Sequence, residues 1–502
     1  MAAFKPRRIL LLTNVDRGEA NVFLATAAAL VETDSSVELH FATFPGLEEP
    51  VAAVSQNARR HAPDAREIVY HSISGLTMAD GLKKYLAENN VPRKDDYLPL
   101  SFLAPLRFST TLKAIGDTIP IMVPYGSVDM AEIVSCIIDI INSVKADLVV
   151  VDTLMTAALT ACYHLGVKFA CLSPNAIKEF AAPVQPWAAG LWRYPALFSG
   201  YSFPVPLHLI PFNIFLTLYT AHTFIGDSHR HAVAQHLASN LKVTLRTPID
   251  LLRNRPDNVK ILVSTLPELD FPSIIPDHVL PCGPIVQTAS PIAESDPELE
   301  QWLAAGPVIY INLGSICLLA EDQALRLAKA LRCVLDRQDT PPRVLWKLKP
   351  YGDYKVTTTG SKIHDVLGPE IDADQVRIVT WVQADPFSIL QTGHILCSVH
   401  HGGANSYNEA VLAGVPQVVL PQWTDCYDYA QRVELLGIGR IGNKTCKPKW
   451  ETEELSQVLL DVAFGKESGS IKKTATHLAS ICHEHGSGAA HAAKILLAEC
   501  DQ

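Results

Sequence analysis

The stretch WVQADPFSILQTGHILCSVHHGGANSYNEAVLAGVPQVVLPQWTDC, residues 381–426, is the most informative part of the chain. An apolar run ends at His400, the Gly-rich turn HHGGANS covers residues 400–406, and a helical pattern follows. A strand, a Gly-rich turn and a helix in this order place backbone N–H groups and a helix N-terminus against a phosphate. In that helix the Glu409 carboxylate can reach two ribose hydroxyls, and the Trp381 ring can stack on a base. The stretch therefore predicts a nucleoside-diphosphate site.

The His pair taken alone has simpler explanations. Paired His residues often cap a helix or lie hydrogen-bonded in a core. A metal site at His400 and His401 is less favoured because no third ligand stands nearby at helical or hairpin spacing. The ordered combination of turn, carboxylate and aromatic residue inside a β–α alternation favours the nucleotide site.

The order of these residues resembles the donor-binding signature of family 1 UDP-sugar glycosyltransferases. The resemblance implies that Trp381 stacks on uracil and that Glu409 binds the ribose. A second strand-to-helix turn, after VIYINL, resembles the FGS turn of the family, which also touches the diphosphate. The diphosphate-binding residues implied in this way are His401, Gly403, Asn405, Ser406, Gly314 and Ser315.

The chain departs from the family pattern at the sugar end of the site. The family closes its signature with an Asp-Gln pair that binds sugar hydroxyls, and here Asp425 is followed by Cys426. Ala384 stands where the family has Gln, and Gln383 lies one place earlier. Sugar identity therefore depends on Trp423, Asp425 and Cys426, and glucose is the default that the resemblance implies.

Composition places the chain among globular proteins. Its 502 residues, 48% of them hydrophobic and 19% charged, are enough for two domains of about 200–250 residues. The net charge of −10 argues against a nucleic-acid or anionic-lipid surface, although it does not exclude a local basic cleft. Eleven cysteines without a CxxC motif indicate free thiols in a reducing compartment, so we expect a cytoplasmic protein.

Two apolar segments bear on targeting. The run in MAAFKPRRILLLTNV is too short for the apolar region of a signal peptide and is interpreted as a first buried strand. Residues Tyr194–Gly226 contain no Asp, Glu, Lys or Arg, but prolines leave only Phe212–Gly226 uninterrupted. That piece is shorter than the roughly 20 residues of a membrane-spanning helix. We interpret the segment as an acceptor-pocket wall or core, with peripheral membrane contact as the less favoured alternative.

The order of apolar runs and helical patterns predicts an α/β fold. The first half is predicted to contain strands of a parallel sheet that are joined by helices. The predicted strands are RRILLLTNV, VELHFAT, EIVYHSIS, ADLVVVD and VKFACLSP. After a Pro-rich linker the alternation restarts with VIYINLGS, RVLWKLK, VRIVTWV, HILCSV and PQVVL. Two Rossmann-like doubly wound domains facing each other across a cleft form the GT-B fold of the resembled family. The predicted divisions are an acceptor domain (1–284), a linker (285–298), a donor domain (299–470) and C-terminal helices (471–502), the last of which packs on the first domain.

The candidate catalytic base is the point at which this sequence departs most from the resembled family. In the resembled family a His after the first strand removes the acceptor proton and an Asp after a later strand orients it. Here the matching positions hold Glu19 and Asp152. Burial beside an ionised Asp152 raises the pKa of Glu19 toward neutrality, whereas the N-terminus of its helix favours the charged form. The alternatives are that Glu19 caps its helix while His71 is the base, that Asp152 only caps a strand end, or that neither position supplies a base.

The resemblance implies inverting transfer of a sugar, by default glucose, from a UDP-sugar to a hydroxyl of a small apolar acceptor. Phenolic acceptors in secondary metabolism fit best, because the hydroxyl of a phenol has a lower pKa than that of an aliphatic alcohol and a weaker base can remove its proton. No metal and no other cofactor are expected, since the Asp372–Asp374 pair lacks the apolar strand that precedes a metal-binding DxD. A nucleotide-sugar-binding protein without transferase activity and another double-Rossmann enzyme, such as an epimerase, are the competing hypotheses.

Overall fold

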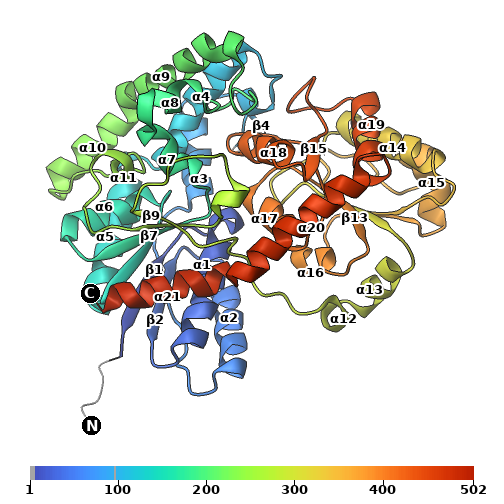
Figure 1. Cartoon of the computed structure of the whole chain (residues 1–502). Coiled ribbons are helices and arrows are strands. Elements are labelled where there is room, and N and C mark those ends of the chain that lie inside the picture. The colour runs from blue at the N-terminus through green and yellow to red at the C-terminus, as the bar shows by residue number, and fades with distance from the viewer. Residues whose placement is uncertain (1–5, 95–97, 502) are drawn as a thin grey trace.

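Short apolar runs that are buried on both faces become the strands of two parallel sheets, and helices cover each side of them (Figure 1). The computed structural model describes residues 6–94 and 98–501. The predicted fold class, two Rossmann-like domains, is confirmed. The sequence patterns missed three strands of three residues each, because such short runs show no period. These strands are β8 (Ile261–Val263), β9 (Val279–Pro281) and β15 (Gly439–Ile441).

The first sheet has seven strands in the order β3-β2-β1-β6-β7-β8-β9. Its strands are β1 (Arg8–Leu12), β2 (Glu38–Thr43), β3 (Val69–Ser72), β6 (Leu148–Asp152), β7 (Phe169–Ser173), β8 (Ile261–Val263) and β9 (Val279–Pro281). The long helices around it are α1 (Arg17–Thr33), α2 (Glu48–His61), α3 (Met78–Glu88), α4 (Phe108–Met122), α5 (Ser127–Val144), α6 (Thr156–Leu165), α9 (Ile210–Gly226) and α10 (Ser228–Asn240), with short helices α7 (Lys178–Ala181), α8 (Ala189–Trp192) and α11 (Asp250–Arg253). A small hairpin pairs β4 (Arg93–Lys94) with β5 (Leu98–Pro99).

The second sheet has six strands in the order β12-β11-β10-β13-β14-β15. They are β10 (Val308–Asn312), β11 (Arg343–Lys347), β12 (Val376–Val379), β13 (Ile395–His400), β14 (Gln417–Val419) and β15 (Gly439–Ile441). Its helices are α12 (Ile292–Ser295), α13 (Pro297–Ala304), α14 (Glu321–Asp336), α15 (His364–Asp372), α16 (Pro386–Leu390), α17 (Ala404–Leu412), α18 (Cys426–Leu435) and α19 (Thr452–Ala463).

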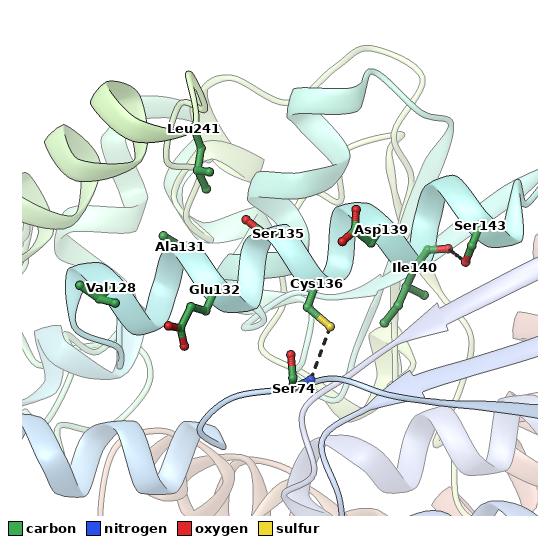
Figure 2. Close-up of a pocket in the computed structure, with 10 residues that line it drawn as sticks. All are labelled: Ser74, Val128, Ala131, Glu132, Ser135, Cys136, Asp139, Ile140, Ser143 and Leu241. Atoms are coloured by element: carbon green, nitrogen blue, oxygen red, sulfur yellow. Dashed lines mark hydrogen bonds between the residues drawn. The ribbon is translucent and has the colours of Figure 1, made fainter.

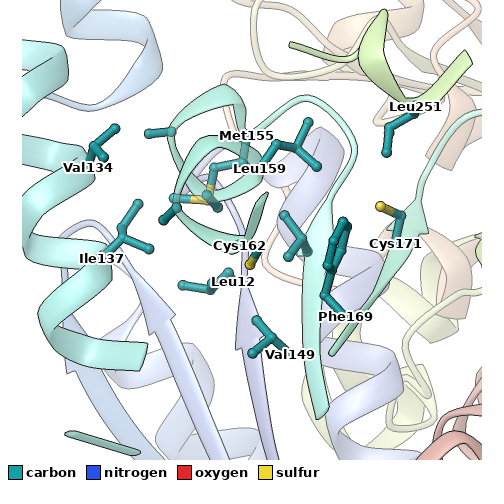
Figure 3. Packing of buried hydrophobic residues seen from close by; sticks show 14 of the residues in the cluster. Leu12, Val134, Ile137, Val149, Met155, Leu159, Cys162, Phe169, Cys171 and Leu251 are labelled. Carbon is teal, nitrogen blue, oxygen red and sulfur yellow. The ribbon is translucent and has the colours of Figure 1, made fainter. Parts of the chain in front are cut away.

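The core of the first domain lies on both faces of its sheet. Figure 3 shows one face, where Leu12 and Val149 of neighbouring strands pack with Ile137 of α5 and Leu159 of α6. All four side chains are at most 1% exposed. Full burial of an aliphatic side chain stabilises a fold by about 1.5–3 kcal/mol, so this layer fixes the positions of the strand ends that follow it.

The chain returns to the first domain at its end. Helix α20 (Ser468–His485) packs against α17, and α21 (Gly488–Cys500) lies along α1, as the red helices in Figure 1 show. The α21 side chains Ala492, Ala493 and Leu496 are fully buried in the core shared with α1. The predicted division at residue 470 falls inside α20.

A buried ion pair joins the two domains. The Nε of Arg432 in α18 donates to Oδ1 of Asp270 at 2.6 Å, and both side chains are 1% exposed. Nearby, Tyr407 OH donates to the carbonyl of Leu269 at 2.9 Å, and Asn408 Nδ2 donates to that of Ser264 at 3.1 Å. These bonds hold α17 and α18 of the second domain against the segment that follows β8.

The apolar segment Tyr194–Gly226 does not behave as one unit. Tyr194 and Phe198 are buried, but only three residues of α9, namely Asn213, Leu216 and Phe224, are buried. Most of α9 therefore lies outside the core, which is one of the two environments predicted for the segment, and the other, an acceptor-pocket wall, stays a prediction. Among the described residues, Leu207–Asn240 is one helical stretch long and apolar enough to cross a membrane, with 17% of its apolar window buried; the pair α4–α5, bent by 43°, meets the same criteria jointly.

Neutralising one partner of the buried pair should destabilise the protein. Asp270→Asn leaves the Arg432 guanidinium charged and uncompensated, which costs about 3–5 kcal/mol at a buried site. Urea denaturation followed by tryptophan fluorescence measures the loss. Glu467→Gln, at the exposed pair of Glu467 with Arg440, is the matched control and should change stability by less than about 1 kcal/mol. Equal effects of the two variants would contradict the role of the buried pair.

Candidate functional site

The two sheets each reverse their strand order beside a central strand. In the first sheet the reversal falls between β1 and β6, and in the second it falls between β10 and β13. Loops that leave strands at such a point diverge and open a crevice at the carboxyl ends of the strands. Glu19 and Asp152 follow β1 and β6, and Gly314 and His401 follow β10 and β13. The topology therefore places both groups of predicted residues at the two crevices.

Glycines make room for the His401 ring. A Cβ at Gly403 would lie 2.5 Å from Nε2 of His401, and one at Gly314 would lie 2.8 Å from its Cε1. Gly402 has a φ of +90°, and a Cβ there would meet the carbonyl oxygen of Cys426 at 2.7 Å. Only glycine fits these positions, so the two loops close around one imidazole.

The two adjacent histidines have different surroundings. His400 is buried; its Nδ1 accepts from the N–H of Gly402 at 3.1 Å and its Nε2 donates to Oε1 of Gln417 at 2.8 Å. His401 Nδ1 is buried and has no hydrogen-bond partner among residues 6–94 and 98–501. Burial, with the nearby His400 and Lys347, lowers the pKa of His401 to about 3. His400 is thus structural, whereas His401 presents a neutral ring with a free nitrogen.

The N-terminus of α17 is open to an anion. Its N-cap, Gly403, has no side chain, so no side-chain hydrogen bond caps the helix. The first backbone N–H groups of a helix have no partners within it, and they favour a phosphate. Ser406 lies in this first turn. Asn405 donates its side-chain N–H to the carbonyl of Arg17 at 3.1 Å, so its amide joins the two domains as well as lying on the turn.

The residues expected at the nucleoside lie along the same edge. Trp381 follows β12 and is 59% exposed. Ala384 is buried and Gln383 is exposed, so Gln383 is the residue of the pair that is accessible to a ligand. Glu409 lies in α17, where burial and the charge of Asp385 raise its pKa to about 8.

Lys347 is a residue of this site that the sequence analysis missed. It ends β11, and its Nζ lies 4.6 Å from the centre of the Trp381 ring and 3.5 Å from the carbonyl oxygen of Gly314. Burial lowers the pKa of its ammonium. The register that pairs Lys347 with Asn312 puts the two strand ends side by side, and this pairing is the signal that could have found it.

The sugar end of the site is built from the loop after β14. Asp425 accepts a bond from Thr424 Oγ1 at 2.9 Å, and burial raises its pKa. Thr424 has a φ of +32°, and Trp423 lies with its ring centre 5.9 Å from that of His401. Cys426 is 1% exposed, and burial raises the pKa of its thiol. A thiol is only a weak donor and a weak acceptor, so it is a poor substitute for the amide that the family has there.

On the other side of the cleft the structure brings Glu19 and Asp152 together. Their carboxyl groups lie close enough for the charge of one to raise the pKa of the other, and the side chains are 7% and 0% exposed. Asn14 Nδ2 donates to Oε2 of Glu19 at 2.7 Å, and Thr13 Oγ1 donates to Oδ2 of Asp152 at 3.1 Å. Burial, followed by the charge of Asp152, raises the pKa of Glu19 well above its ordinary value. Burial also raises the pKa of Asp152, which accepts a bond from the Leu154 N–H at 2.9 Å.

This pair holds one proton between two carboxyl groups. Burial raises both pKa values and two neighbouring carboxylates repel each other, so the two groups share the proton. Glu19 lies in the first turn of α1 without capping it. Burial and the second carboxyl group therefore outweigh the helix dipole.

The alternative base, His71, makes its contacts with residues other than Glu19 and Asp152. His71 lies on the edge strand β3, and its Nε2 is 2.8 Å from Nδ1 of His40, which in turn contacts Glu38. Burial lowers the pKa of His71. Within the described residues no hydrogen bond joins His71 to Glu19 or Asp152, so the structure does not bring the alternative base into this pair.

Other features do not contribute to the site. Asp374 pairs with Arg377 at 2.7 Å on the surface, and no group of three or more His, Cys, Asp or Glu in the described ranges is arranged to hold a metal ion. A groove of about 810 Å³ runs along the outer face of α5, where the N–H of Ser74 approaches Sγ of Cys136 at 3.5 Å (Figure 2). None of the predicted site residues lines this groove.

Comparison with known proteins agrees with this geometry. Residues 369–481 match the family model described as Erythromycin biosynthesis protein CIII-like, C-terminal domain. The chain is 32% identical over 519 residues to Glycosyltransferase sdnJ of Sordaria araneosa, covering 98% of each chain. UDP-glycosyltransferase 84B1 of Arabidopsis thaliana is 30% identical over 222 residues, which cover 40% of this chain and 45% of the relative.

Solved structures share the whole architecture. A UDP-glucosyltransferase of Polygonum tinctorium, described as capable of glucosylating indoxyl, aligns over 100% of both chains with a TM-score of 0.61 and 16% identity. At that identity the likeness concerns the fold alone. The sequence similarity, by contrast, extends over the full length of a glycosyltransferase, and it includes both sheets and the loops that carry the site. This chain therefore belongs to the family 1 glycosyltransferases of the GT-B fold and is an enzyme that transfers a sugar from a UDP-sugar.

Proposed function

We propose that this enzyme transfers glucose from UDP-glucose to a hydroxyl of a small apolar, phenolic acceptor, with inversion at the anomeric carbon. The proton-sharing pair Glu19–Asp152 takes the acceptor proton. One observation carries the proposal: the bond from Asn405 of the donor turn to the Arg17 carbonyl holds that turn two residues from Glu19. A buried acid–base pair and an open diphosphate turn thus face the same cleft.

In the donor half, the diphosphate binds at the N-terminus of α17 and to His401, whose ring is neutral. Trp381 stacks on uracil, and Glu409 accepts hydrogen bonds from the ribose hydroxyls. The Lys347 ammonium supplies positive charge between the base and the phosphates. Hydrogen bonds that strengthen as the phosphate gains charge stabilise the leaving UDP.

In the transfer step the acceptor oxygen forms a bond to the anomeric carbon while the bond from that carbon to the UDP oxygen breaks. The electron pair of the broken bond goes to the β-phosphate oxygen. The acceptor proton passes to the free oxygen of Glu19 as Glu19 gives its own proton to Asp152, so the pair ends neutral. An acidic phenol needs least from such a base.

An aromatic wall supports an apolar acceptor. The rings of Phe102 and Phe198 lie 4.9 Å apart, and Phe198 contacts Tyr427 of the second domain at 6.3 Å. Trp423 packs against the same cluster, beside the sugar-end residue Asp425. The rings of Phe102, Phe198 and Tyr427 are at most 3% exposed, so in our proposal they support the acceptor site from within the core. All eleven cysteines are free, which supports our proposal of a cytoplasmic enzyme of secondary metabolism.

Removing the His401 ring should weaken donor binding. His401→Ala loses a diphosphate hydrogen bond and should reduce UDP affinity by about 1–3 kcal/mol, measured by titration calorimetry. His477→Ala, at an exposed position of α20, is the control and should bind UDP as the parent does. Unchanged affinity in His401→Ala would remove this residue from the site.

Donor affinity should depend on the ionisation of Glu409. Ribose hydroxyls donate to a carboxylate, so binding favours the ionised form and UDP affinity should rise as the pH increases through about 8. Calorimetry in buffers of different ionisation enthalpy should show proton release below that pH. Glu409→Gln should bind more weakly and lose this part of the pH dependence; a variant with the same pH dependence as the parent would refute the assignment.

Turnover should depend on Glu19. Glu19→Gln keeps the shape but cannot accept the proton, so kcat should fall by roughly 10²–10⁴ with UDP affinity unchanged. The fall should be larger for aliphatic alcohols than for acidic phenols. Glu32→Gln, exposed at the end of the same helix, is the control. Full activity of Glu19→Gln together with collapse of His71→Ala would transfer the role of base to His71.

A further inference from the structure

The outward face of α9 is apolar and uncovered. In Figure 1 the helix runs along the rim of the first domain with no element outside it. Phe212, Phe215, Leu218 and Ile225 recur at helical spacing on this face and are each between 47% and 54% exposed. A helix that is apolar on all sides is normally buried in a core or in a membrane, yet only three residues of α9 are buried in the protein itself.

The exposed face extends beyond α9. Phe108, at the start of α4, packs on Phe212 and Phe215 with ring centres 5.8 Å and 5.5 Å apart, and Leu207 is 85% exposed. We call Phe108, Leu207, Phe212, Phe215, Leu218 and Ile225 the α9 patch. A contiguous apolar surface of this kind marks a binding site for another apolar surface.

Three polar side chains of α9, Asn213, Thr217 and Thr220, make hydrogen bonds inside the protein. Thr217 and Thr220 donate their hydroxyls to carbonyls one turn earlier in the helix, at 2.9 Å each. Asn213 is fully buried and donates to the carbonyls of Leu191 and Tyr194. Protein interfaces carry about one hydrogen bond per 100–200 Å², whereas hydrocarbon requires none. The patch residues Phe212, Phe215, Leu218 and Ile225 carry no polar side-chain atoms, and a surface of this kind fits lipid better than a protein partner.

The surroundings of the patch match a membrane interface. Trp187 lies just before α8 and is 92% exposed, and Trp192 is the last residue of α8 and is 39% exposed. Helix α8 packs against α9. Tryptophan favours the boundary between headgroups and hydrocarbon.

The flanking charges near the patch are mainly basic. Arg107 directly precedes α4, and Arg193 directly follows α8. Arg230 lies in the first turn of α10, the helix after α9. The acidic groups of the same elements are engaged: Asp117 pairs with Lys113, and Asp227 caps α10. Because the net charge of the chain is −10, apolar insertion is the main source of affinity and the local basic side chains add to it for anionic lipids.

We propose that the α9 patch docks on the surface of a lipid bilayer, with α9 lying in the interface rather than crossing it. Asn213 and Leu216 are buried and hold one side of α9 on the protein, so α9 lies along the surface of the domain although the stretch Leu207–Asn240 is long and apolar enough to cross a membrane. Leu216 belongs to the cluster that contains Phe198 and Tyr427, so the docked face lies one helix away from the aromatic wall. The inference concerns lipid binding and does not depend on the identity of the acceptor.

Vesicle flotation with the purified full chain tests the inference. The chain should float with phosphatidylcholine vesicles, and more of it should float when phosphatidylserine is included at low salt. The triple variant Phe212→Gln, Phe215→Gln, Leu218→Gln should lose at least about tenfold in vesicle partitioning. The control Val128→Gln, Leu435→Gln changes exposed apolar side chains on α5 and α18 and should float as the parent does.

Calorimetric UDP affinity equal to that of the parent shows that each variant is folded. A parent chain that binds UDP and transfers sugar but does not float would overturn the inference and leave the proposed function standing. Sedimentation velocity tests whether a second copy of the chain covers the patch instead of lipid. A parent chain that forms a dimer and does not bind vesicles, together with a triple variant that is monomeric, would assign the patch to that second copy.

Discussion

In each sheet the strand order reverses beside the central strand, so the loops that follow two neighbouring strands diverge and leave backbone N–H groups uncovered. The rest of the structure depends on where these two gaps lie. One is beside β1 and contains Glu19, and the other is beside β10 and contains the glycine turn around His401. The buried pair Arg432–Asp270 and the Asn405–Arg17 contact keep the two gaps facing each other. Neither half alone could hold both a donor and an acceptor.

Burial is the common cause of the unusual titration in the cleft, and it acts with opposite sign on acids and bases. It lowers the pKa of His401 to about 3, so the ring is neutral at the diphosphate. It raises the pKa of Glu409 to about 8 and keeps a proton between Glu19 and Asp152. Low polarity favours the uncharged form of every group. In our proposal such a site changes its protonation when the substrates arrive, because ribose hydroxyls that donate to Glu409 favour its ionised form.

The same physics explains why α9 is unusual. An apolar helix on the outside of a protein lowers its free energy only when something removes its surface from water. The inner side of α9 finds such a partner in α4 and α8, while the outer side has none among the described elements. Its position beside the aromatic wall brings lipid and the candidate acceptor site close together. An enzyme for apolar acceptors would then meet its substrate where that substrate concentrates.

The sequence by itself indicated the fold class, since runs such as ADLVVVD and VIYINL alternate with helical patterns in the manner of parallel strands. It also indicated the donor turn, because Gly403 and Gly314 lie in turns between a strand and a helix, and the structure adds that these glycines leave room for the His401 ring. It could not assign Lys347, whose role depends on the register of β11 beside β10, nor choose between Glu19 and His71. The tertiary structure adds that His71 contacts His40 while Glu19 lies beside Asp152, and on this ground we propose Glu19 as the base. Periodicity described α9 as apolar, but which of its sides meets solvent was decided by tertiary packing, because burial is a property of neighbours that lie far away in the sequence.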